Sequence, residues 1–172
     1  MAKELLELLK TRRSIRKYKA EQVKTEELDA VLEAGTYAPT GIGAQSPVIV
    51  AVQDPETRDA IVMGTESDPY YGAPTLVIVL ADPERGTWVE DGSCVLDNMM
   101  NAAHALGLGS CWIHRERQMF DSPEGKDLLK TWGLPETLRG VGSIALGYPD
   151  GAAPEPKPRK PGYIVKIEKS RQ

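Results

Sequence analysis

The sequence contains few cysteines and histidines and no long apolar run. Its 172 residues include two cysteines, Cys94 and Cys111, and two histidines. Because the cysteines have no CxxC spacing, the pattern indicates neither a zinc site nor a disulfide framework, and we expect two reduced, buried thiols and no metal. No apolar run approaches the roughly 20 residues that a membrane helix needs, and the N-terminal apolar stretch is too short for a signal peptide. The protein is therefore expected in the cytoplasm, with no membrane partner.

Positive charge is also in deficit. The chain has 21 Lys and Arg against 25 Asp and Glu, which gives a net charge of −4. Affinity for a phosphate backbone needs an excess of basic residues, so a general nucleic-acid binder is excluded. With 41% hydrophobic and 27% charged residues, the composition is that of an ordinary globular protein. The length is close to that of one domain, and we expect a single domain over residues 1–172.

Hydrophobic periodicity and turn residues place the helices and strands. Helical spacing predicts helices at 3–11, from an N-cap at Thr25 to about Gly35, at 88–106 and at 122–132, with a short helix beginning at 54–57. Apolar, β-branched runs predict strands at 48–52, 76–80, 110–113 and 141–146, the first two of them buried on both faces. Residues 64–74 are expected to form a surface loop, and Gly107 and Gly109 are the C-cap candidates of the long helix.

Two segments indicate a subunit interface. The helix expected at 88–106 is apolar or small around most of its circumference, so it must be buried on nearly all sides. The proline-rich tail at 150–162 is expected to be extended, and the sequence YIVKI at 163–167 is a strand candidate. Because an extended arm ending in a strand is well suited to lying along a partner, we expect a homodimer.

A basic cluster follows the first helix in a chain that is acidic overall. It contains Arg12, Arg13, Ser14 and Arg16. Guanidinium groups beside a hydroxyl donor suit a bound phosphate. The alternative is a solvated basic face without a ligand.

A loop of small and rigid residues precedes the first strand, at 38–47. Its small residues let backbone amides approach a flat ring, and Gln45 offers both a donor and an acceptor to the edge of a heterocycle. Pro39, Thr40 and Gly41 belong to the same loop. A plain helix-to-strand turn explains this composition equally well.

Two further segments carry candidate site residues. His114 and Arg115 end the third strand, where a ligand-binding role is as plausible as a structural one, whereas His104 is expected to be packed within its helix. Lys157 and Arg159 form a second basic cluster in the tail, which can reach the same phosphate as Arg12 or can be a flexible basic segment.

In this order, the motifs RRSIRKY, the loop with Gln45, AAHALGLGSCWI, LGYP and KPRKP resemble the nitroreductase-like family of FMN enzymes over nearly the whole chain. The resemblance implies an α+β fold, with a central, mostly antiparallel sheet surrounded by helices. It also implies an interlocked homodimer with an extended C-terminal arm and FMN bound between the subunits.

Carried onto this chain, the family's site falls into three groups. Basic and hydroxyl residues resemble the phosphate and ribityl contacts: Arg12, Arg13, Ser14, Arg16, Lys157 and Arg159. Loop residues resemble those that reach the flavin of the partner chain: Pro39, Thr40, Gly41 and Gln45. The backbone of Trp112, Ile113, His114 and Arg115 resembles the segment whose amide faces flavin N5. Gly43 and Ser46-Pro47 depart from the family's frequent Asn and Pro-Trp, which removes one polar contact and one aromatic wall.

The resemblance implies an oxidoreductase in which NAD(P)H reduces FMN, and FMN then reduces a small electron-poor molecule, such as a nitroaromatic or a quinone, in a ping-pong cycle. No side chain is assigned as a general acid. Two alternatives stay open, namely an FMN-binding sensor or storage module without turnover and a specialised flavin enzyme of the same fold.

Overall fold

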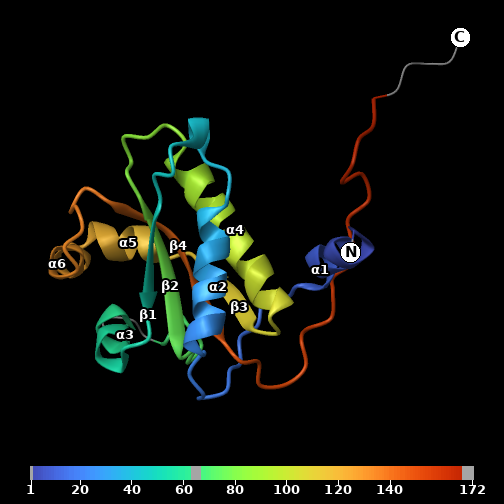
Figure 1. Cartoon of the computed structure of the whole chain (residues 1–172), viewed down its shortest axis with the longest axis horizontal. Coiled ribbons are helices and arrows are strands. Elements are labelled where there is room, and N and C mark those ends of the chain that lie inside the picture. The colour runs from blue at the N-terminus through green and yellow to red at the C-terminus, as the bar shows by residue number, and fades with distance from the viewer. Residues whose placement is uncertain (1, 63–66, 168–172) are drawn as a thin grey trace, which may run out of the picture.

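The fold is built on one antiparallel sheet of four strands (Figure 1). The computed structural model describes residues 2–62 and 67–167. The strands are β1 (Val48–Val52), β2 (Thr75–Ala81), β3 (Gly109–Ile113) and β4 (Arg139–Gly147). They lie in the order β1-β2-β4-β3, and every neighbouring pair is antiparallel. The expected α+β fold with a central antiparallel sheet is thereby confirmed.

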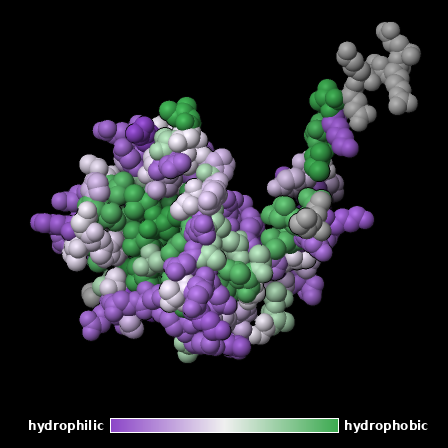
Figure 2. All heavy atoms as spheres, viewed as in Figure 1, coloured by the Kyte–Doolittle hydropathy of each residue, from purple (hydrophilic) through white to green (hydrophobic). Residues whose placement is uncertain are grey.

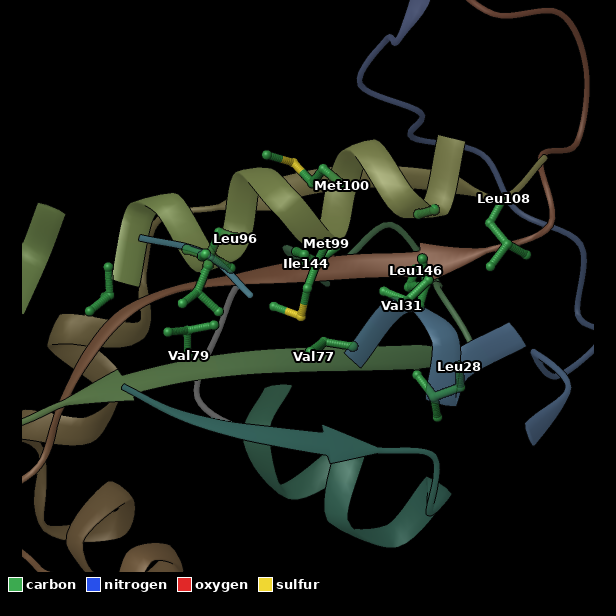
Figure 3. Close-up of a cluster of buried hydrophobic side chains, with 14 of the residues drawn as sticks. Leu28, Val31, Val77, Val79, Leu96, Met99, Met100, Leu108, Ile144 and Leu146 are labelled. Carbon is green, nitrogen blue, oxygen red and sulfur yellow. The ribbon is translucent and has the colours of Figure 1, made fainter. Parts of the chain in front are cut away.

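Helices cover both faces of the sheet (Figure 1). They are α1 (Ala2–Thr11), α2 (Thr25–Thr36), α3 (Pro55–Val62), α4 (Trp88–Ala105), α5 (Glu116–Asp121) and α6 (Pro123–Thr131), with a short 3₁₀ turn, η1, at Gly41–Gly43. The side chains of α2 and α4 form one core cluster with Val77 and Val79 of β2 (Figure 3). Those of α3, α5 and α6 form a second cluster with Leu76 and Ile78. Successive β2 side chains thus enter opposite cores, as the two-residue period of a strand requires.

The two strands that were expected to be buried on both faces differ. Every residue of β2 is buried, as expected, because strands lie on both sides of it and helices on both faces. In β1 only Val52 is buried, and Ala51 is exposed. The expectation for β1 is therefore wrong for this chain, because β1 is an edge strand with a single neighbour.

Several boundaries also differ from the expected ones. Thr25 is not the N-cap of α2 but its first residue, after Lys24, which makes no side-chain capping bond. Gly107 follows the end of α4 with a φ of +77°, as a helix-ending glycine should, but Gly109 already belongs to β3. The helix expected at 122–132 corresponds to α6, which Ser122 caps by accepting from the Gly125 amide. The preceding α5 was not expected.

Two extended segments also correct the sequence-based expectations. In the loop before β2, Tyr70 and Ala73 are fully buried, so its described part is no simple surface loop, while residues 64–66 of that prediction lie outside the described residues. Residues 163–167 form no strand and are exposed along their whole length, because no strand lies beside them within residues 2–62 and 67–167.

The N-terminal helix and the C-terminal arm lie together at one side of the molecule, away from the sheet (Figure 1). On α1, Leu5, Leu6 and Leu9 each expose more than half of their surface. Apolar surface is visible on this side and also over β1 (Figure 2). None of the helices within 2–62 and 67–167 is long and apolar enough to cross a membrane.

Candidate functional site

The basic cluster runs beside the outer edge of β3. Ser14 forms a parallel bridge with Ser110, and the Ile15 amide donates to the Ser110 carbonyl at 3.0 Å. Tyr18 fixes the segment, because its hydroxyl donates to the carbonyls of Ile15 and Ala145. The cluster therefore lies where α4 ends and β3 begins.

A cavity of about 250 Å³ opens at this junction, and Arg12, Arg13, His104 and Ser110 are among its lining residues. The Ser110 hydroxyl oxygen is buried and has no hydrogen-bond partner within the described residues. Burial and then the charges of Arg12 and Arg13 lower the pKa of His104. The cavity thus combines positive potential with a free hydroxyl, which suits an anion such as a phosphate group.

His104 itself is packed, as expected, since its Nε2 lies 3.0 Å from the Thr11 hydroxyl oxygen. Arg13 donates to the carbonyls of Lys10 and Arg12. Its guanidinium is therefore partly engaged by the end of α1.

The other basic residues do not meet Arg12 in this chain. The guanidinium of Arg16 lies over the ring of Tyr71, 5.7 Å from its centroid. Arg159 is exposed and donates to the carbonyl of Lys157, which is exposed as well. The sequence thus identified a cluster of charges, but among the described lysines and arginines only Arg12 and Arg13 line the cavity.

The loop at 38–47 is held against the first turn of α4. The Gly41 amide donates to Asp91 Oδ1 at 2.8 Å, and a Cβ at Gly41 would lie 2.3 Å from the Thr87 hydroxyl oxygen. The Gln45 amide donates to the Thr40 hydroxyl at 3.0 Å. The whole loop therefore has a defined conformation on α4.

This conformation is strained at its tip. Ile42 and Gln45 have φ values of +51° and +49°, which residues with a Cβ rarely adopt. The side chain of Ile42 is fully exposed. A strained, exposed apolar tip is typical of a segment that contacts something outside its own chain. At the family departure Gly43, a Cβ would meet no atom within 4 Å.

The loop and the basic cluster lie far apart within one chain. Asp91, which holds the loop, is in the first turn of α4, whereas His104, beside the basic cluster, is in its last turn. At about 1.5 Å per residue, these positions are roughly 20 Å apart along the helix axis. The loop also leads into β1, while the cluster lies against β3, at the opposite edge of the sheet.

The end of β3 exposes backbone groups along an open edge. Because the Ser110 carbonyl points away from β4, the alternation of an antiparallel ladder turns the Trp112 N–H the same way and the Ile113 N–H toward β4. His114 is exposed. Arg115 turns inward, where its Nη1 donates to the Ile61 carbonyl and its side chain lines a cavity of about 650 Å³.

Sequence reasoning missed two buried carboxylates beside these segments. Asp91 is 5% exposed and Glu116 is 1% exposed. Glu116 accepts from Tyr70, Ser143 and the Arg115 amide, while burial raises its pKa. Both acids lie in charged stretches near a helix start, a pattern that normally indicates exposure, so only the long-range contacts of the fold identify them.

The comparisons with known proteins agree on one family. The model of the nitroreductase family matches residues 9–63 and 63–148. A crystal structure of a nitroreductase with bound FMN from Bacteroides fragilis is 35% identical, with a TM-score of 0.86, and the match covers 96% of this chain and 99% of that one.

Two curated relatives agree with this match. A protein of Methanothermobacter thermautotrophicus, named provisionally as an NADH dehydrogenase/NAD(P)H nitroreductase, is 34% identical over 85% of this chain and 78% of its own. The FMN reductase [NAD(P)H] of Bacillus subtilis is 27% identical over 94% of this chain and 72% of its own length.

Proposed function

This chain belongs to the nitroreductase family, and we propose that it is an FMN-dependent oxidoreductase that uses NAD(P)H to reduce small electron-poor organic molecules, such as nitroaromatics or quinones. The named activities of its relatives support this proposal, since they include NAD(P)H nitroreductases and FMN reductases. The 172 residues would form one FMN-binding domain, acting in the cytoplasm.

One observation carries the cofactor assignment. Ser110, whose buried hydroxyl is unpartnered within the described residues, lines one cavity with Arg12 and Arg13, at the start of a strand whose outer edge carries the Trp112 amide. The cavity offers a hydroxyl and two cations to a phosphate, and the outer edge of β3 offers backbone groups to a flat heterocycle. The residues present therefore fit FMN, with Ser14, which is bridged to Ser110, beside the phosphate end.

When bound, FMN would supply the hydride chemistry between NAD(P)H and the oxidant. The chain supplies binding, orientation and charge. Arg12 and Arg13 would hold the phosphate, and any of the nearby cations that faced the ring would stabilise negative charge there. The outward-facing backbone groups of the segment from Trp112 to Arg115 would orient the ring, and no side-chain general acid would be required.

The proposed site takes residues from two chains of a homodimer. Pro39, Thr40, Gly41 and Gln45 would reach the flavin held by the partner's basic cluster, because in one chain the two groups are separated along α4. The open edge of β1 and the exposed leucines of α1 support such pairing. In a dimer the C-terminal arm would also bring Lys157 and Arg159 to a phosphate.

Ligand titration and turnover together test the function. FMN should bind tightly, as measured by the quenching of its fluorescence. Riboflavin, which lacks the phosphate, should bind at least about tenfold more weakly because it loses the charge-assisted contacts. NADH oxidation should rise when a quinone or a nitroaromatic is added to the FMN-loaded protein. Equal affinities for FMN and riboflavin would refute the phosphate site, and tight FMN binding without any turnover would identify a binding module instead.

A further inference from the structure

Glu116 is a carboxylate buried where a helix begins. It is the first residue of α5, and it directly follows the turn His114–Arg115 at the end of β3. A Cβ at Gly140 would lie 2.3 Å from the Glu116 carbonyl carbon, so only glycine lets the start of α5 approach β4 so closely. This close approach places the carboxylate inside the sheet's second core.

The two oxygens of Glu116 have different partners. Oε1 accepts from the Tyr70 hydroxyl at 2.9 Å and from the Ser143 hydroxyl at 2.5 Å. Oε2 accepts from the Arg115 amide at 3.0 Å. One oxygen therefore anchors the side chain to β4 and to the loop before β2, while the other holds the backbone of the turn.

This arrangement decides which amides remain available at the end of β3. The Trp112 amide points to the outer edge, the Ile113 amide points toward β4, and the Arg115 amide is engaged by Glu116. Without Oε2, the partly buried Arg115 amide would lose its acceptor, and the turn would have to rearrange to satisfy it.

We propose that Glu116 is a positioning residue for the flavin reaction: by holding the Arg115 amide, it fixes the turn that follows the flavin-facing edge of β3. The inference rests on the proposed function, since the edge matters to chemistry only if the flavin ring lies along it. Glu116 touches neither the ring nor the substrate and acts through the backbone of Arg115.

Substitutions that affect one or the other oxygen of Glu116 distinguish a positioning role of this residue from a packing role. Glu116→Gln keeps the size of the side chain, and if its carbonyl retains Tyr70 and Ser143, its amide group faces the Arg115 N–H and that bond is lost. Tyr70→Phe and Ser143→Ala are matched controls, because each removes one donor to Oε1 and leaves the Oε2 bond. The readouts are hydrogen exchange of the Arg115 amide in the FMN-free protein, the visible spectrum of bound FMN, and kcat and KM for NADH with a quinone.

In Glu116→Gln we expect at least about tenfold faster exchange of the Arg115 amide, an altered flavin absorption band, and a kcat lowered about tenfold with KM within about twofold, because a small misplacement of the ring costs rate rather than binding. The two controls should keep slow exchange and nearly normal kcat. Unchanged exchange in Glu116→Gln, or an equal loss of kcat in the controls, overturns the proposal.

Two further outcomes also have a defined meaning. If Glu116→Gln does not fold, Glu116→Asp replaces it with the same expected results, since its shorter side chain keeps the charge but withdraws an oxygen from the Arg115 amide. If the wild-type protein neither binds FMN nor turns over, the proposed function fails, and the exchange comparison alone upholds or overturns the hold of Glu116 on the turn.

Discussion

At the scale of single residues, the same strand carries a positive site at its start and a buried acid just beyond its end. Arg12 and Arg13 lie beside Ser110, whereas Glu116 lies behind Arg115. The first pair can meet a ligand directly, and the acid is shielded from it. Substitutions at the two ends should therefore affect different quantities, binding at one end and geometry or stability at the other.

Arg12→Ala should weaken FMN binding without unfolding the protein. The lost charge-assisted contact is worth about 1.5 to 3 kcal/mol, or roughly tenfold to a hundredfold in the dissociation constant. Fluorescence titration measures this change, and Lys130→Ala, an exposed change of equal charge on α6, is the matched control. With saturating FMN, turnover should recover if Arg12 serves only the phosphate and stay low if it also faces the ring. Unchanged affinity and turnover would mean that Arg12 belongs to a solvated basic face without a ligand.

The pH dependence of stability should reveal the buried state of Glu116. Burial raises its pKa in the folded protein above the ordinary value of about 4.3. Between the unfolded and the folded pKa, the folded state therefore binds more protons than the unfolded state. The stability due to this proton is present at low pH and is lost as the pH rises through the folded pKa. Urea unfolding should show the wild type losing free energy of unfolding relative to Glu116→Gln as the pH increases from about 4. Parallel profiles for the two proteins would contradict the raised pKa.

At the scale of elements, local sequence predicted strands β1 to β4 and every α-helix except α5, but not which strands are neighbours. The runs at β1 and β2 have similar composition, yet only β2 is buried on both faces, because the order β1-β2-β4-β3 is set by long-range pairing. The strand expected at 163–167 has the right residue types but no partner strand in the part of the chain that the structure describes. Edge position and strand pairing are properties of the assembled sheet and leave no local pattern.

The site shows the same limit. Arg12, Arg13 and Ser14 could be predicted because the chain is acidic overall and positive charge is concentrated there. Asp91 and Glu116 could not be found, since an acid near a helix start normally serves the helix dipole from the solvent side. Their roles depend on Gly41 and Ser143, which are distant in sequence and come close only when the sheet is formed.

The contact between the loop and α4 can be tested through Asp91. Asp91→Ala leaves the Gly41 amide without its acceptor and should lower the free energy of unfolding by about 1 to 3 kcal/mol. It should also accelerate hydrogen exchange of the Gly41 amide. Glu90→Ala, an exposed substitution in the same turn, should stay within about 0.5 kcal/mol of the wild type. Normal protection of Gly41 in Asp91→Ala would show that the loop is held by other contacts.

At the scale of the whole molecule, the arrangement of the proposed site distinguishes a site built by one chain from a site shared by two. The basic cluster lies at the C-terminal end of α4 and the loop at 38–47 at its N-terminal end, so a single flavin meets both only if they come from different subunits. The exposed leucines of α1 and the open edge of β1 leave surfaces that contact with a second copy would bury. Light scattering should accordingly give the mass of a dimer for the FMN-loaded protein.

Subunit complementation tests the shared site more strictly than mass does. Arg12→Ala disables the phosphate end and Gln45→Ala disables the loop, so each homodimer carries two impaired sites. In a mixed dimer with shared sites, one site receives both substitutions, while the other combines the intact Arg12 of one chain with the intact Gln45 of its partner. Coexpression with two different tags isolates this dimer, which should recover about half of the wild-type activity at limiting FMN. If each site instead belonged to one chain, every site would keep one defect, and the mixed dimer would be no more active than the mean of its parents.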